Sequence, residues 1–178
     1  MKKALLDASS AILLFKADLL SKLTDIYCVA VTQSVLHELT RENHCGADTF
    51  HHYAAQKKIG VIDVGSGEFP CRKSLLPSRS LGRGEGDTIK CFAAGGWDFI
   101  ITDDGRAARY CRRNNLPFIN ALLFPRLLYF CHGISLAESN HTLKAISSLG
   151  RYSSAVIDWA ESCKKEALLF AIPDSCGV

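Results

Sequence analysis

The stretch that decides the fold is Leu81 to Arg106, LGRGEGDTIKCFAAGGWDFIITDDGR. It predicts a helix over residues 84–94, because Gly-Glu-Gly-Asp is typical of a helix start and Gly-Gly follows the end. Residues 99–102 are apolar or β-branched and lead directly into Asp103 and Asp104. Such a run is typical of a central parallel strand, and open α/β sheets bind ligands at the carboxyl ends of these strands. We therefore interpret this stretch as half of an active site.

Strands alternate with helices along the rest of the chain. Further buried strands are expected at residues 3–6, 26–31, 60–64 and 117–120. Helices are expected from the turn at 8–10 to about residue 20, from 32 to about 39, and over 47–58, 106–115, 122–130, 136–149 and 154–169. Residues 65–83 are rich in glycine, proline and serine, which is typical of a surface connection. The alternation predicts an α/β fold with a five-stranded parallel sheet and helices on both faces.

Length and composition indicate one globular domain, or one domain with an appendage. The 178 residues are 48% hydrophobic and 22% charged, and the net charge of +3 permits an anionic partner without requiring one. The eight cysteines include no C-x-x-C pair, so buried reduced thiols are favoured over disulfides. His44-Cys45 and His51-His52 have no recognised zinc spacing.

Membrane insertion and secretion are not expected from the sequence. The longest apolar stretch, residues 117–131, contains polar interruptions and is shorter than the roughly 18 to 20 residues of a membrane span. The N-terminal Met-Lys-Lys resembles the start of a signal peptide, but the apolar run after it breaks at Asp7. A cytoplasmic protein is expected.

Carboxylates follow the strands in a pattern that suggests a metal site. Asp7 ends the first strand, and Glu38 lies in the helix after the second strand. Asp87 opens the helix before the fourth strand, and the fourth strand ends in Asp103-Asp104. Each acid taken alone can be explained as a helix cap or a solvated surface group. Together at one edge they would raise one another's pKa, and a hard divalent cation removes that conflict. Oxygen ligands favour Mg²⁺ or Mn²⁺ over zinc.

Four ordered blocks resemble a known family, the PIN-domain nucleases. The blocks are LLDASSAI, VTQSVLHELTRE, LGRGEGDTIKCFA and DFIITDDGRAARYCRRNNLPFINA, and the resemblance covers residues 3–125. It is strongest to small prokaryotic PIN proteins similar to VapC-like toxins. The resemblance implies a three-layer α/β/α fold with sheet order 3-2-1-4-5 and a Mg²⁺- or Mn²⁺-dependent endoribonuclease, a hydrolase. It also implies a homodimer, and an antitoxin protein as partner if the chain is the toxin of a toxin–antitoxin pair.

The resemblance also assigns site residues, taken block by block. The acids of the family match Asp7, Glu38, Asp87 and, for the fourth position, Asp103 or Asp104. The family's T-x-D pattern selects Thr102 and Asp104, while Asp103 remains a candidate co-ligand. Ser9 matches a small hydroxyl position that would support the first acid. Residues 1–125 would form the nuclease domain, and residues 126–178 a C-terminal helical extension packed on the same domain.

An RNA substrate requires positive charge outside the acidic site. Arg106, Arg109 and Arg113 recur at helical spacing after Asp104 and could follow a phosphate backbone. A solvated basic helix face explains them equally well.

Other functional classes fit the sequence less well. A phosphatase of the haloacid-dehalogenase type requires a second aspartate two residues after the first, where this chain has Ser9. Glu38 does not suit a receiver domain, and the first strand lacks the glycines of a dinucleotide-binding fold. The main alternative is a PIN-like module that binds RNA or protein without cleaving it.

Overall fold

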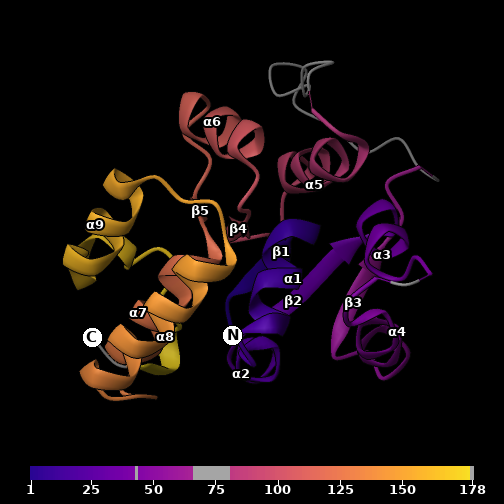
Figure 1. Ribbon diagram of the computed structural model, residues 1–178. Coiled ribbons are helices and arrows are strands. Elements are labelled where there is room, and N and C mark those ends of the chain that lie inside the picture. Colours follow the sequence, from indigo (N-terminus) through magenta and orange to yellow (C-terminus); the bar gives the residue numbers. More distant parts are fainter. Residues whose placement is uncertain (43, 66–80, 177–178) are drawn as a thin grey trace.

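A parallel sheet lies at the centre of the structure, a computed structural model that describes residues 1–42, 44–65 and 81–176 (Figure 1). The five strands in these residues follow the order β3-β2-β1-β4-β5, and every neighbouring pair is parallel. They are β1 (Lys3–Leu6), β2 (Cys28–Thr32), β3 (Ile59–Ile62), β4 (Phe99–Ile101) and β5 (Phe118–Ile119). The predicted α/β fold with sheet order 3-2-1-4-5 is confirmed.

Helices connect the strands and extend the chain beyond the sheet. The helices before the fourth strand are α1 (Ala8–Lys16), α2 (Leu20–Ile26), α3 (Gln33–Leu39), α4 (Ala47–Ala55) and α5 (Arg83–Ala94). Those after it are α6 (Gly105–Arg113), α7 (Phe124–Phe130), α8 (Leu136–Leu149) and α9 (Ser154–Ser162). A short 3₁₀ turn, η2 (Ala121–Leu123), precedes α7, and two more, η3 (Lys165–Leu168) and η4 (Asp174–Cys176), follow α9.

Alternate residues of the central strands face two separate hydrophobic layers, because successive side chains of a strand point to opposite faces. Leu6 and Ile101 belong to the larger cluster, which α1, α2, α7 and α8 complete. Leu5 and Ile100 belong to the smaller cluster, to which α5 and α6 contribute. The sheet is therefore buried on both faces, as a three-layer α/β/α fold requires.

The register of β1 and β4 brings two site residues side by side. Leu6 pairs with Ile101, so Asp7 and Thr102, which follow them, leave the sheet together. The Asp7 amide donates to the Ile101 carbonyl at 3.0 Å, which extends the pairing by one residue. This edge is the carboxyl end of the sheet.

The C-terminal helices pack into the larger cluster. Leu143 and Ile146 of α8 are fully buried against the sheet layer. Arg126 of α7 is 5% exposed, and its guanidinium donates to the carbonyls of Ala160 and Glu161 at 3.0 and 2.7 Å. These bonds satisfy carbonyls in the last turn of α9, which hold no intrahelical partner. The division at residue 125 stays a prediction.

Helix boundaries differ from the expectation in several places, among them the end of α4, which lies at Ala55 and not at residue 58. The helix expected to reach residue 20 ends at Lys16, where Asp18 adopts a left-handed φ of 56° that breaks the helix, and α2 begins two residues later. Because α2 continues to Ile26, the second strand starts at Cys28 and not at residue 26. The last predicted helix, 154–169, ends at Ser162, because Cys163 is extended.

The glycine pair after α5 stops that helix as expected. Gly95 and Gly96 both have positive φ, 96° and 86°, a conformation that side chains disfavour. Most of the predicted surface connection, residues 66–80, lies outside the described residues. No described helix is long and apolar enough to span a membrane.

Candidate functional site

Asp7 is the most buried acid at the carboxyl edge of the sheet, with 3% of its surface exposed. Its Oδ2 accepts hydrogen bonds from the hydroxyls of Ser9 at 2.9 Å and Thr102 at 3.0 Å. The pKa of Asp7 is raised from 3.8 to about 6, mainly by burial and to a smaller degree by the negative charge of Glu85, although the two hydroxyls act to lower it. The carboxylate is therefore held in a fixed orientation in an environment that disfavours its negative charge.

The doubled acid after β4 divides into two different environments. Asp104 caps α6, since its Oδ1 accepts from the amides of Arg106 and Ala107, both at 2.8 Å. Asp103 turns toward the larger cluster, where its Oδ2 accepts from the Ser10 hydroxyl at 2.6 Å. Thr102 connects Asp7 with Asp104, because its hydroxyl, which donates to Asp7, also accepts from the Asp104 amide at 3.3 Å.

Two further donors surround Asp103. The Ala121 amide donates to Oδ2 at 2.9 Å, and the Tyr152 hydroxyl donates to Oδ1. Burial raises the pKa of Tyr152 far above its usual value, and the charge of Asp103 raises it further, so the phenol is the proton donor of this pair. Three donors thus occupy both oxygens of Asp103.

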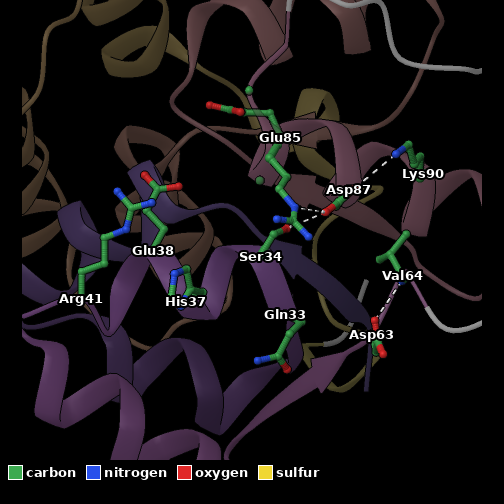
Figure 2. Close-up of a pocket in the computed structure, with 14 residues that line it drawn as sticks. Gln33, Ser34, His37, Glu38, Arg41, Asp63, Val64, Glu85, Asp87 and Lys90 are labelled. Carbon is green, nitrogen blue, oxygen red and sulfur yellow. Dashed lines mark hydrogen bonds and ion pairs between the residues drawn. The ribbon is translucent and has the colours of Figure 1, made fainter.

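Glu38 and Asp87 line a cavity of about 890 Å³ between α3 and the start of α5 (Figure 2). The Oδ2 of Asp87 accepts from the Ser34 hydroxyl at 2.8 Å. Glu38 lies one helical turn after Ser34 and is exposed, so both face the same side of α3. The helices approach closely here, because a Cβ added to Gly84 would lie 3.4 Å from the Glu38 Oε2.

Basic side chains accompany the acids of this cavity. Lys90 lies 3.3 Å from Asp87 Oδ1, and Arg83 Nε lies 3.9 Å from Asp87 Oδ2. Arg41 and His37 also line the cavity (Figure 2). The cavity therefore combines carboxylate oxygens with cationic groups. This arrangement suits a phosphate group that a metal cation would bridge to the carboxylates.

The acids lie around one rim in two groups and do not form a closed cage. Over residues 1–42, 44–65 and 81–176, no group of three or more His, Cys, Asp or Glu side chains is close enough to hold a metal ion. Asp7 and Asp104 stand at the strand ends, and Glu38 and Asp87 stand in the cavity. Glu85 connects the groups, since it lines the cavity and its charge acts on Asp7. In chemical type, these oxygen donors fit Mg²⁺ or Mn²⁺.

The three arginines predicted to bind RNA are exposed on α6. Arg106, Arg109 and Arg113 follow directly from the capping residue Asp104, so the helix carries them away from the strand ends. In Figure 1, α6 stands beside α5 at the same end of the sheet. Their role in RNA binding stays a prediction.

Sequence reasoning did not assign four residues that the structure brings to the site, namely Ser10, Ser34, Glu85 and Tyr152. Glu85 belongs to the predicted helix start and lies two residues from Asp87. The spacing of Glu85 and Asp87 was the signal that could have included it. Tyr152 had no such signal, because it lies 49 residues from Asp103 in a segment that resembles no motif.

Comparison with known families finds one match relevant to the site. A family model described as a PIN domain matches residues 3–124, which contain β1 through β5 and every acid described above. No curated protein and no solved structure matches the chain.

Proposed function

The chain belongs to the PIN-domain family, a family of nucleases that bind nucleic acid, and we propose that it is a metal-dependent endoribonuclease that hydrolyses RNA phosphodiester bonds. The observation that carries the proposal is Asp7. It is buried at the carboxyl edge of the sheet, is oriented by two hydroxyls, and lies within the electrostatic reach of Glu85. Positive charge beside such a carboxylate would offset the free-energy cost of its ionisation.

The proposed ligands of Mg²⁺ or Mn²⁺ are Asp7, Glu38, Asp87 and Asp104, with Asp103 as the additional candidate from the doubled acid. A bound ion would lower the pKa of a water nucleophile and neutralise the developing charge on the leaving oxygen. The chain's own contribution is orientation. Ser9 and Thr102 hold the Asp7 carboxylate, and Ser34 holds that of Asp87, so the acids are arranged before substrate binds.

The proposed RNA contacts use positive charge on both sides of the acids. Arg106, Arg109 and Arg113 are exposed on α6, while Arg83 and Lys90 stand at the cavity. Phosphate groups of an RNA strand would be bound by these cations on either side of the scissile bond. The proposals of a toxin role, an antitoxin partner and a homodimer rest on the resemblance to small PIN proteins.

A second candidate function is RNA binding without cleavage. It is favoured by the ion pairs of Asp87 with Arg83 and Lys90, which neutralise one acid without a metal. In this function the cavity would bind a phosphate through its cations, and the acids would be structural.

Cleavage of a labelled pool of cellular RNA distinguishes the two functions. Purified protein is incubated with Mg²⁺, with Mn²⁺ or with EDTA, beside the Asp7→Asn variant and beside single-stranded DNA as a second substrate. We expect metal-dependent cleavage of RNA, and a loss of at least roughly 10³-fold in Asp7→Asn, because a ligand contributes several kcal/mol of transition-state stabilisation. Metal-loaded, folded protein that binds RNA without cutting it would establish the binding module instead.

The role of Glu38 in cleavage can be tested against a nearby glutamate in the turn that follows α3. Glu38→Gln keeps the shape of the side chain but removes a charge from the cavity, and we expect cleavage to fall by roughly 10²-fold. Glu42→Gln is the matched control, because Glu42 is exposed four residues later and does not line the cavity. It should cleave at the wild-type rate. Equal rates for the two variants would remove Glu38 from the site.

A further inference from the structure

We propose that Tyr152 is a positioning residue of the active site, which acts through Asp103 on the turn of residues 102–104. The inference rests on the proposed nuclease function and deepens it. Tyr152 lies between α8 and α9, beyond residues 3–124 that match the family. A segment outside the family match therefore completes the site.

Asp103 has the contacts of an anchor, which favours Asp104 over Asp103 as the metal ligand of the doubled acid. Ser10 from α1 and the amide of Ala121 both bond Oδ2, and Tyr152 bonds Oδ1. Three parts of the chain thus converge on one carboxylate. Because these donors bond both oxygens, the Asp103 side chain fixes the position of its own backbone. Asp104 is therefore the better placed of the two aspartates to bind a cation.

The position of the Asp103 backbone is transmitted directly to Asp7. The Asp103 amide donates to the Ser9 hydroxyl at 3.3 Å, and this same hydroxyl donates to Asp7 Oδ2 at 2.9 Å. On the other side, the Asp104 amide donates to Thr102, whose hydroxyl bonds the same Oδ2. A shift of the 102–104 turn would therefore disturb both hydroxyls that orient Asp7.

The absence of a side chain at Gly150 leaves room for the ring of Tyr152. The ring packs over Gly150 at the end of α8, where an added Cβ would lie 2.9 Å from the ring Cζ. Real Cβ atoms do not approach this closely, so any larger residue at Gly150 must displace the ring. The glycine thus lets the phenol reach Asp103.

The decisive variant is Tyr152→Phe, which keeps the ring and removes only the hydroxyl. We expect kcat to fall roughly 10- to 100-fold, as is typical when a group that supports a ligand is lost. KM for RNA should stay unchanged, because the hydroxyl acts through Asp103. Mn²⁺ affinity, measured on the protein without RNA by electron paramagnetic resonance of free Mn²⁺, should weaken over the same range.

Tyr27→Phe is the matched control for the loss of a tyrosine hydroxyl bond. Tyr27 is 1% exposed, and its hydroxyl donates to the Ala171 carbonyl at 2.8 Å on the larger cluster. This variant loses one buried hydrogen bond and should keep wild-type kcat and Mn²⁺ affinity. Thermal melts of both variants establish that they are folded.

Gly150→Ala tests the same contact without removing the hydroxyl. It should reproduce the kcat and Mn²⁺ losses of Tyr152→Phe, and the double variant should lose no more than either single one, because both break one interaction. If the wild type is active and Tyr152→Phe has the same kcat and Mn²⁺ affinity as Tyr27→Phe, the role of Tyr152 is overturned while the proposed function stands. A wild type that neither cleaves RNA nor binds Mn²⁺ overturns the proposed function, and this inference with it.

Discussion

Asp7→Asn is expected to stabilise the metal-free protein while it abolishes cleavage. The folded environment raises the pKa of Asp7 from 3.8 to about 6, mainly through burial. Above that pH the native state must hold a charge that its surroundings disfavour. This pKa shift corresponds to a free-energy cost of about 3 kcal/mol for holding the charge in the folded protein. Asparagine is neutral and removes this cost. At pH 7.5 in EDTA, the free energy of unfolding of the variant should exceed that of the wild type by about this amount.

The sign and the pH window of this effect follow from the two pKa values. Below pH 3.8 the carboxyl is protonated in both folded and unfolded chains, so its ionisation contributes no difference. Between 3.8 and about 6 the native state binds more protons than the unfolded state, and the stability of the wild type falls as pH rises. Above about 6 the full cost applies. Urea denaturation of both proteins from pH 3.5 to 8 would trace this window.

A surface aspartate and a metal ion provide the controls. Asp158→Asn replaces an exposed carboxylate on α9 and should change the free energy of unfolding by at most about 0.5 kcal/mol. Added Mn²⁺ should stabilise the wild type in proportion to its binding, and Asp7→Asn far less. An Asp7→Asn variant that is less stable than the wild type at pH 7.5 in EDTA would show that Asp7 is favourably placed without a cation.

A chain shortened after Gly133 is expected not to fold, although it contains the whole sheet. It lacks four large apolar side chains of the larger cluster that are at most 4% exposed, namely Leu143, Ile146, Leu168 and Ile172. Burial of each contributes roughly 1.5–3 kcal/mol, so their sum is comparable with the total stability of about 5–15 kcal/mol that a domain has. Arg126 would also lose the two carbonyls that it bonds.

Circular dichroism during heating tests this expectation. The shortened chain should show no cooperative transition, whereas a chain that ends at Pro173 keeps the four side chains and should unfold like the full-length protein. Cooperative unfolding of the chain shortened after Gly133 would mean that residues 126–178 are an appendage to an independently stable domain.

The five-stranded parallel sheet and the acids at its strand ends could be predicted from the sequence. Apolar runs and turn residues are local signals that predict the strands and helices, whereas the order of the strands was implied by the family resemblance. Asp7 and Asp104 follow strands, so their place at the carboxyl edge is a consequence of strand ends alone. The break between α1 and α2 is not visible in the sequence, because the left-handed conformation of Asp18 leaves the apolar pattern unchanged.

The sequence by itself determined which acids stand at the edge of the sheet, and only the tertiary structure decided what each one contacts. Asp103 and Asp104 are identical neighbours in the sequence, yet one bonds Tyr152 and the other caps α6. Ser34 and Asp87 are 53 residues apart, and nothing in either segment indicates the other. Strand ends follow from short-range patterns, whereas hydrogen bonds between distant segments depend on how helices pack around the sheet, which no local pattern encodes.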